Sequence, residues 1–266
     1  MRSTNLPWQI KMFRRSIKKQ QKLRALLELL GETTGKKCLL ITCGDNNGAL
    51  NWYFRQHGGE WTWADISGEN NDQISGLLGE PVHAFKEDNF PVPDGHFDCV
   101  VSIDVLEHLS QDQPFLKELR RVLRLGGKAV VTVPNGDQRL LANKIKWRFG
   151  MTPEVYGHTR AGYTVPELCE ALRKSGLEPK NTGGYSRFVT EMIELVINFG
   201  YVRVLAKKQG NVQPGHIAPV SAGDLKTHGL AYKAYSLIFP IARAISLLDF
   251  LLPAQTNNAV IVSAQK

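Results

Sequence analysis

The chain has 266 residues, 42% of them hydrophobic, which is enough to bury a complete core as one large domain or as one domain with appendages. Its four cysteines show no metal-type spacing, which argues against a zinc site or a disulfide scaffold and for a reducing compartment. The net charge of +8 is concentrated at the start, because residues 1–30 hold eight Lys and Arg but one Glu. No apolar run typical of a secretory signal is present there, so we expect a cytoplasmic protein.

The first expected element is a basic amphipathic helix within residues 1–33. Apolar side chains recur at helical spacing from Trp8 to Leu30. Gly31 stands where a glycine commonly ends a helix. The lysines and arginines of this segment give the predicted helix its basic character.

From Lys37 onward, short apolar runs alternate with helical stretches, an order that predicts a parallel sheet with crossover helices. The runs at 97–103 and 128–133 are almost continuously apolar, as expected for strands covered on both faces. The first five strands are expected at 38–43, 61–65, 82–85, 97–103 and 128–133, and the helices between them at 47–57, 70–78 and 112–124.

Beyond Pro134 the alternation weakens, and residues 136–162 are expected to form a cap loop. Thr164 stands at a helix N-cap position, and further strands are expected at 179–186 and 258–264. The segment between those strands is too long for a hairpin and is expected to be a helical insertion. The predicted domains are the N-terminal helix (1–33), a core (34–186), the insertion (187–256) and a final core strand (257–266).

A turn rich in glycine and asparagine follows the first expected strand. It runs from Gly44 to Gly48 and precedes a helix, so its backbone and the helix N-terminus can approach an anionic group of a ligand. Asp65 ends the next strand 21 residues after Gly44, where an acidic side chain accepts hydrogen bonds from both ribose hydroxyls of a nucleoside. The structural alternatives are an ordinary turn and an aspartate that caps the following helix.

Five sequence motifs follow one another between residues 38 and 135 and end in Thr132-Val133-Pro134-Asn135. The first four are Cys43-Gly44-Asp45, Ala64-Asp65-Ile66-Ser67, Phe90 to Asp98, and Ser102 to Leu109. The fifth begins with Leu119 to Gly127 and continues to Asn135. Together they resemble the core of the class I S-adenosylmethionine-dependent methyltransferases, particularly the group that acts on small molecules. The resemblance implies a Rossmann-like, doubly wound α/β sheet of seven strands with the last one antiparallel, and S-adenosyl-L-methionine as cofactor.

The resemblance also implies a role for individual residues of the cofactor site. The loop after the first strand is expected to pass under the methionine part of the cofactor, through Thr42, Gly44, Asp45, Asn46 and Gly48. Asp65, followed by Ile66, is expected to hold the ribose. Glu87 or Asp88 is expected to face the adenine amino group, and Asp104 to lie beside the methionine end.

The chain departs from the family pattern within this site. Leu40 and Lys86 stand where acidic residues are usual, and Thr42 and Asn46 replace two glycines. Because asparagine adopts the left-handed conformation more readily than most residues, we expect Asn46 and Asn47 to close the loop. The departures also motivate an alternative function, a methyltransferase-like protein that has lost turnover and serves as a binding or scaffold subunit. A nucleotide-dependent oxidoreductase is disfavoured because the turn lacks further glycines of its pattern.

Two histidines, His158 and His108, are the candidate bases for removing the proton of an acceptor hydroxyl. The stretch from His158 to Thr164 resembles one that borders the acceptor pocket of related enzymes. There Arg160 is expected to pair with an anionic acceptor and Tyr163 to contact the substrate; alternatively, His158 and Arg160 only fix the loop by bonding backbone carbonyls. Asp104, Glu107 and His108 offer metal-type ligands, but we expect no bound metal.

Residues 234–253 carry a broad apolar face against a narrow polar stripe and are too short and too charged to span a bilayer. Packing on the core, a dimer face and a membrane interface remain open for this segment. Together with residues 1–30 it is consistent with peripheral contact at the inner face of a membrane. No nucleic-acid recognition motif accompanies the charge. The predicted activity is O-methylation of a lipid, glycan or other small metabolite.

Overall fold

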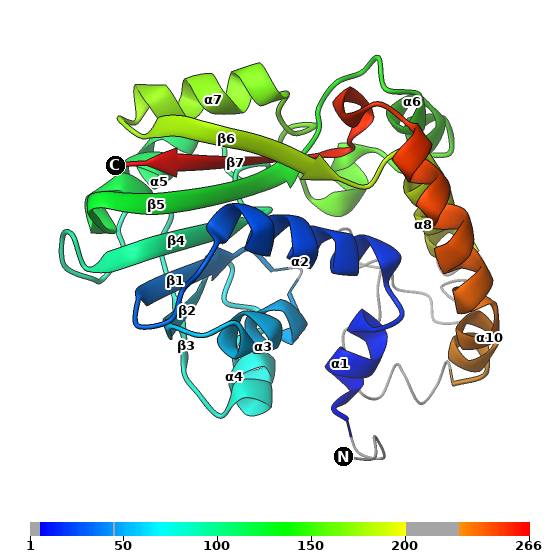
Figure 1. The fold of residues 1–266 in the computed structure, drawn as a ribbon, viewed down its shortest axis with the longest axis horizontal. Helices are drawn as coiled ribbons and strands as arrows, with labels where there is room; N and C mark the ends of the chain where they lie inside the picture. The colour runs from blue at the N-terminus through cyan, green and yellow to red at the C-terminus, as the bar shows by residue number, and fades with distance from the viewer. Residues whose placement is uncertain (1–5, 45, 201–228) are drawn as a thin grey trace. The chain divides into compact units, whose positions relative to one another are not determined.

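The computed structural model describes residues 6–44, 46–200 and 229–266 and divides the chain into two compact units (Figure 1). The sheet unit comprises residues 23–137, 158–184 and 259–266, and the helical unit comprises 1–22, 138–157 and 185–258, each within the described ranges. These units divide the chain at other points than the predicted domain boundaries. One boundary between the units falls between Lys22 and Leu23, within the segment that was expected to form the N-terminal helix. Residues 138–157, which were expected to belong to the core, are part of the helical unit.

A seven-stranded sheet in the order β3-β2-β1-β4-β5-β7-β6 forms the centre of the sheet unit. Its strands are β1 (Lys37–Thr42), β2 (Glu60–Asp65), β3 (Val82–Ala84), β4 (Phe97–Ile103), β5 (Leu123–Pro134), β6 (Glu178–Tyr185) and β7 (Ala259–Gln265). The pairs β1–β2, β1–β4, β2–β3 and β4–β5 are parallel, whereas β7 is antiparallel to β5. The expected Rossmann-like fold with an antiparallel last strand is therefore confirmed.

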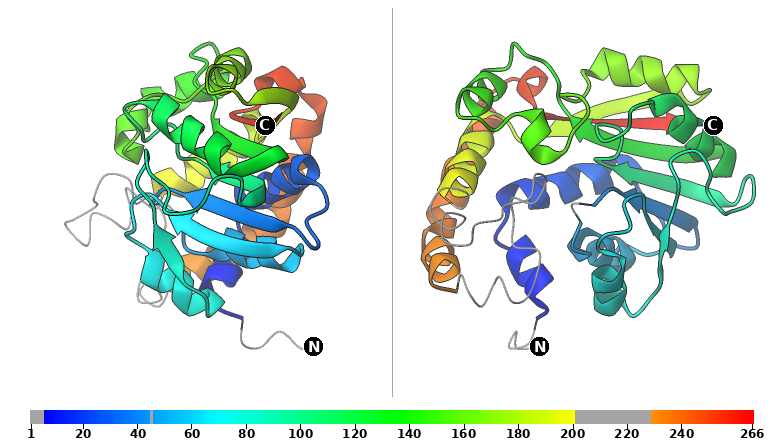
Figure 2. Two further views of the ribbon diagram at one scale, coloured as in Figure 1. Left: turned by 90° about the vertical axis from the view of Figure 1, so that its left-hand side faces the viewer. Right: turned by 180° about the vertical axis from the view of Figure 1, so that it is seen from behind.

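Helices cover both faces of this sheet, as the continuously apolar strands require. On one face, Ala129 of β5 belongs to a core that includes side chains of α5 (Asp112–Val122) and α7 (Val165–Lys174). The neighbouring Lys128 points to the other face, where its ammonium donates to the carbonyl oxygens of Leu29 and Leu30 at the end of α2 (Ile17–Leu30). Figure 1 shows the end of α2 in front of the sheet, and the reverse view in Figure 2 shows the helices on the opposite face.

The predicted strands and crossover helices correspond closely to the observed ones, which include α3 (Ala49–Gln56) and α4 (Asn71–Leu78). The prediction of one continuous N-terminal helix is wrong. It is divided into α1 (Trp8–Phe13) and α2 (Ile17–Leu30). The side-chain oxygen of Ser16 accepts a hydrogen bond from the Lys19 N–H, and the Gln20 amide donates to the carbonyl of Arg14, so polar side chains stabilise the break.

The helical unit is built around α8 (Phe188–Gly200), which contacts α6 (Leu141–Arg148), α10 (Gly229–Ser246) and the short helix η4 (Leu247–Leu251). Two further short helices are η1 (Pro153–Tyr156) and η5 (Ala254–Thr256). The predicted helical insertion also includes residues 201–228, which lie outside the described residues. Among the helices that are described, none is long and apolar enough to cross a membrane.

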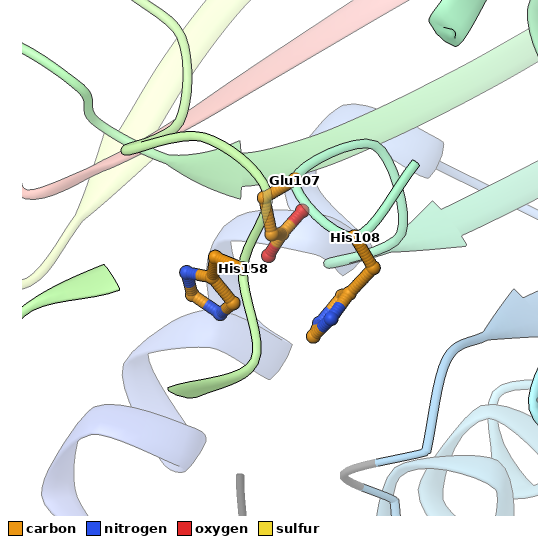
Figure 3. Close-up of side chains that lie close together, drawn as sticks. All are labelled: Glu107, His108 and His158. Atoms are coloured by element: carbon orange, nitrogen blue, oxygen red, sulfur yellow. The ribbon is translucent and has the colours of Figure 1, made fainter. Parts of the chain in front are cut away.

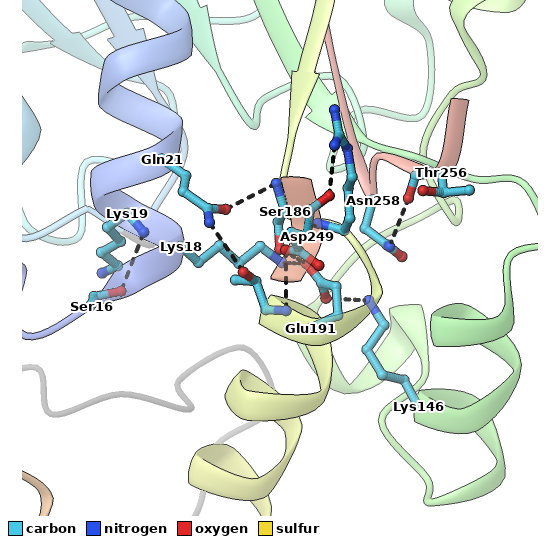
Figure 4. Close-up of polar contacts among 12 residues, drawn as sticks. Ser16, Lys18, Lys19, Gln21, Lys146, Ser186, Glu191, Asp249, Thr256 and Asn258 are labelled. Carbon is cyan, nitrogen blue, oxygen red and sulfur yellow. Dashed lines mark hydrogen bonds and ion pairs between the residues drawn. The ribbon is translucent and has the colours of Figure 1, made fainter. Parts of the chain in front are cut away.

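Buried Glu191 of α8 ties three segments of the helical unit together (Figure 4). One carboxylate oxygen of Glu191 lies 2.7 Å from the Lys18 ammonium, and the other lies 2.9 Å from the Lys146 ammonium. The Ser186 hydroxyl, from the loop before α8, also donates to this carboxylate. Burial alone would raise the pKa of Glu191, but the two ammonium groups outweigh burial and lower it to about 2. The ionised carboxylate therefore stabilises the folded helical unit.

We expect Glu191→Gln to lower the free energy of unfolding at neutral pH by about 3 kcal/mol, because it removes a buried carboxylate and leaves two half-buried ammonium groups without their anion. The folded pKa is below the ordinary carboxyl value of 4.5, so this stabilisation is present above pH 4.5 and is lost as the pH falls toward 2. Urea unfolding followed by circular dichroism at several pH values measures both effects. Glu170→Gln, which removes an exposed ion pair with Lys174, is the control and should change stability little. A deficit of Glu191→Gln that stays constant down to pH 2 would contradict the role of the ion pairs.

Candidate cofactor and acceptor site

The fully buried carboxylate of Asp65, at the end of β2, joins the loop after β1 to the loop after β2. From the first loop it accepts hydrogen bonds from the Thr42 hydroxyl at 2.6 Å and from the Gly44 N–H at 3.2 Å. From the second it accepts the Ser67 N–H at 2.9 Å, the Ser67 hydroxyl at 2.8 Å and the Gly68 N–H at 2.9 Å. A carboxylate has about four acceptor positions, so the donors of the two loops saturate it.

Asn46 closes the loop after β1 by side-chain hydrogen bonds. Its oxygen accepts from the Gly48 N–H at 3.0 Å, and its amide donates to Asn51 at 2.8 Å and to the Thr42 hydroxyl at 3.3 Å. Our expectation that Asn46 and Asn47 adopt the left-handed conformation is wrong, because among the described non-glycine residues only Asp104 and Ser186 have positive φ. The amide side chain of Asn46 replaces the missing glycine in another way, by bracing the loop.

Glycine remains where this loop needs it. Gly44 and Gly48 have φ values of +68° and +85°, and a Cβ at Gly48 would lie 3.1 Å from Leu77. Gly48 directly precedes α3, so the first N–H groups of that helix adjoin the loop. Asp45 lies outside the described residues. The backbone therefore retains a glycine-dependent turn directly before a helix N-terminus, a position at which an anionic group can bind.

The remaining predicted cofactor contacts follow the carboxyl ends of the neighbouring parallel strands, which meet at one edge of the sheet. Half-buried Ile66 follows β2, and its N–H donates to the Thr42 carbonyl at 2.9 Å. Half-buried Glu87 and exposed Asp88 occupy a turn after β3. Asp104 follows β4 with φ +50°, a conformation that is uncommon outside glycine and often found at functional sites.

Glu107, His108 and His158 lie together at the turn after β4 (Figure 3). One ligand-type atom from each lies within 4.8 Å of the others, and the two imidazole rings stand nearly perpendicular with centroids 4.8 Å apart. The Glu107 side chain is fully buried, whereas both histidines are half-buried. A buried carboxylate beside two imidazoles can orient a base or, with the imidazoles, bind a divalent ion. Within the described part of the chain, it is this group, including His158 rather than Asp104, that has metal-site geometry.

The loop that carries His158 is fixed by backbone hydrogen bonds. The N–H and hydroxyl of Thr159 donate to the Glu107 carbonyl at 2.8 Å and 3.0 Å, and the Tyr163 N–H donates to the Pro134 carbonyl at 2.9 Å. Gly162 has φ +117°, and a Cβ there would lie only 2.1 Å from the Pro134 oxygen. A residue with a side chain could occupy that position only if the loop shifted away from Pro134, so Gly162 keeps the loop against the end of β5.

Arg160 and Tyr163, the predicted substrate contacts, lie with Asp112 at the start of α5. The Tyr163 side chain is buried, and its hydroxyl donates to the Asp112 carboxylate at 2.8 Å. The Arg160 guanidinium lies 3.8 Å from the centre of the Tyr163 ring and 3.8 Å from Asp112, and it is exposed. The hydrogen bond to Asp112 holds the Tyr163 hydroxyl at the start of α5, and substrate contacts at Tyr163 and at exposed Arg160 stay predictions.

Comparison with known proteins agrees with this geometry. The sequence profile of the methyltransferase domain matches residues 13–181. A protein of Mycolicibacterium smegmatis named a probable S-adenosylmethionine-dependent methyltransferase is 38% identical over 95 residues, which are 35% of this chain and 34% of that protein. A ubiquinone biosynthesis O-methyltransferase of Cereibacter sphaeroides is 26% identical over 159 residues, covering 56% and 63% of the two chains. The matches thus span less than two thirds of either relative.

Among solved structures, an S-adenosylmethionine-dependent methyltransferase from Thermotoga maritima has the same fold. Its TM-score is 0.55 at 14% identity, with 96% of this chain and 93% of that chain covered. The sheet and its loops define a class I methyltransferase fold. The chain belongs to the methyltransferase-domain family, and S-adenosylmethionine is the cofactor that this membership implies.

Two residues of the site were not identified from the sequence: Ser67 and Asn51, which complete the hydrogen bonds of Asp65 and Asn46. Glu107 was identified together with Asp104 and His108, but in the structure it groups with His108 and His158. Ser67 lies in a loop and Asn51 in the first turn of α3, and both residue types are too common in such positions for the sequence to single out one of them. The spatial proximity of Glu107 and His158 depends on a loop 51 residues further along the chain, which carries no local signal.

We expect Gly162→Ala to destabilise the protein by about 1–3 kcal/mol, because its Cβ would collide with the Pro134 carbonyl. Gly76→Ala in α4 is the matched control, since nothing lies within 4 Å of its Cβ and alanine favours a helix. Thermal unfolding of both variants measures the difference. Equal stability of Gly162→Ala and the native protein would show that the loop does not hold the position described.

Proposed function

We propose that the chain transfers a methyl group from S-adenosylmethionine to a hydroxyl oxygen of a small acceptor of the lipid or glycan type. The observation that carries the acceptor chemistry is the position of His158, beside the buried Glu107 carboxylate in the turn that Asp104 begins after β4. The similarity to a ubiquinone biosynthesis O-methyltransferase supports oxygen as the acceptor atom. Peripheral contact with a membrane through residues 1–30 and 234–253 is part of the proposal.

The residues at the strand ends fit the cofactor by the chemistry of their donors and acceptors. Two of the donors to Asp65 are the hydroxyls of Thr42 and Ser67, whose side chains can rotate away from the carboxylate. Ribose hydroxyls are donors of the same kind and would take these positions on the Asp65 carboxylate. Gly44, Asn46 and Gly48 would hold the methionine part, with Asp104 beside it, and Glu87 or Asp88 would accept from the adenine amino group.

When bound, S-adenosylmethionine supplies a methyl group on a sulfonium. His158 would receive the proton of the acceptor hydroxyl, so that the oxygen carries an electron pair for the methyl carbon. Thr159, which follows His158 in sequence, donates hydrogen bonds to the backbone carbonyl of Glu107. These bonds keep the Glu107 carboxylate and the His158 imidazole close together. The carboxylate would stabilise the imidazolium that forms, and His108 would orient the pair. Arg160 would attract an anionic acceptor.

The direct test measures transfer of labelled methyl from S-adenosylmethionine into lipid and glycolipid extracts by the native protein and by His158→Gln. We expect the variant to lose about 10²–10⁴-fold in turnover and to retain cofactor binding, because it lacks the base and leaves the Asp65 loops intact. His83→Gln, which changes an exposed histidine of β3, is the control and should be fully active.

Three results would contradict parts of the proposal. Turnover that a chelator abolishes and a divalent ion restores would assign Glu107, His108 and His158 to a metal instead of a base. Full activity of His158→Gln would remove the residue from the chemistry. A folded native protein that binds no cofactor and transfers no methyl group would favour the binding or scaffold alternative.

A further inference from the structure

The segment from Leu237 to Leu251 is oriented with its apolar side outward. Phe239 and Ser246 of α10 are buried, at a spacing of two helical turns. The opposite side of the helix exposes four large apolar side chains: Leu237, Ile238, Ile241 and Ile245. Apolar residues were expected from the sequence to form one face, but ordinary packing would have turned that face inward.

The next helix, η4, continues the exposed apolar surface. Phe250 is 86% exposed and Leu251 76% exposed, and Leu247 and Leu248 are exposed as well. The buried residue of this turn is the charged one, Asp249, at 7% exposure. Single exposed leucines are ordinary on soluble proteins, but eight large apolar side chains within fifteen residues indicate an interaction surface.

Asp249 is responsible for the inverted orientation of η4. Its carboxylate accepts hydrogen bonds from the N–H groups of Arg187, Val189 and Thr190 at 3.1, 2.8 and 3.2 Å. The latter two are N–H groups of the first turn of α8, which lack partners within the helix and favour a negative charge. The Arg187 guanidinium also donates to the Asp249 carbonyl at 2.7 Å. With Asp249 held inward, its neighbours Leu248 and Phe250 must face outward.

Positive charge accompanies this surface in the same unit. The Arg15 guanidinium lies 5.2 Å from the centre of the Phe239 ring, and Tyr235 donates to the Arg15 carbonyl, so α10 packs on the connection between α1 and α2. Arg14 and Arg243 are exposed. By sequence, the segments 1–22, 138–157 and 185–258 hold 18 Lys and Arg against 5 Asp and Glu, whereas the rest of the chain holds 15 against 20. The basic excess therefore belongs entirely to the segments of the helical unit.

We propose that the outward side of α10 and η4 is a docking surface for an anionic lipid bilayer, with the apolar side chains in the acyl boundary and the cations of the helical unit attracting lipid phosphates. Charge complementarity selects this occupant. A purely apolar partner would not require a net charge of +13 in the same segments, and a nucleic acid would not require exposed Phe250 and Leu251. The inference rests on the membrane contact in the proposed function and identifies the surface that makes it.

The test is partition of the full-length protein onto vesicles of phosphatidylcholine alone and of phosphatidylcholine with phosphatidylglycerol, measured by sedimentation without S-adenosylmethionine. We expect at least about tenfold stronger binding to the anionic vesicles, weakened by salt. Phe250→Ser combined with Leu251→Ser should lower that binding at least about tenfold. Leu125→Ser changes a leucine of β5 that is 88% exposed, and it should alter binding by less than about twofold.

Circular dichroism of each variant establishes that it is folded, and cofactor binding measured without vesicles tests the methyltransferase site separately. A folded native protein that stays in solution with both vesicles would overturn the docking surface and leave the methyltransferase proposal standing. Equal vesicle binding by the native protein and the double variant would overturn it too. A dimer that the double variant abolishes, without lipid binding, would assign the surface to a second copy of the chain.

Discussion

A buried carboxylate must be matched by hydrogen-bond donors, and in this protein Asp65 meets that requirement with groups from two loops. The Gly44 N–H and the Thr42 hydroxyl come from the loop after β1, and the Ser67 and Gly68 N–H groups come from the loop after β2. Because movement of either loop would take hydrogen-bond donors from a buried charge, Asp65 fixes the strand ends that carry the proposed cofactor contacts. Thr42, which departs from the glycine of related enzymes, contributes one of these bonds.

Much of the sheet unit was predictable from local patterns. Apolar runs of strand length alternate with amphipathic helices, and this order favours a doubly wound sheet, so β1 to β5 and the crossover helices lie near their expected positions. Asp65 could be singled out as a candidate ribose ligand because it ends the second expected strand, 21 residues after Gly44. The side-chain bonds of Asn46 were not predictable, since the conformation of an asparagine depends on which partners the fold places beside it.

The misjudged elements depend on contacts between residues far apart in sequence. Apolar periodicity in 234–253 indicates that one face is apolar, but not whether that face is buried. The outcome is decided by Asp249, which lies 60 residues after the α8 N–H group of Val189 that it accepts. Similarly, Glu107 and His158 meet because the Thr159 and Tyr163 backbone bonds hold one loop against two strand ends. Such pairings belong to the fold as a whole.

The two compact units carry residues of different chemistry, which suit different parts of the proposed function. The sheet unit carries the carboxylates and histidines at the strand ends, and its segments have more acidic than basic residues. The segments of the helical unit carry the basic excess and the outward apolar side chains, which suit an anionic lipid surface. Since one fold supports many reactions, the proposed acceptor chemistry depends on His158 and Glu107 and not on the sheet.

Backbone hydrogen exchange of the native protein, measured with and without S-adenosylmethionine, tests whether the loops joined by Asp65 hold the cofactor. We expect slower exchange at the amides of Gly44, Ser67 and Gly68, which already donate to Asp65, and little change at the Gly126 amide near the amino end of β5. Protection elsewhere in the chain, with unchanged exchange at the amides of Gly44, Ser67 and Gly68, would contradict this role of the loops.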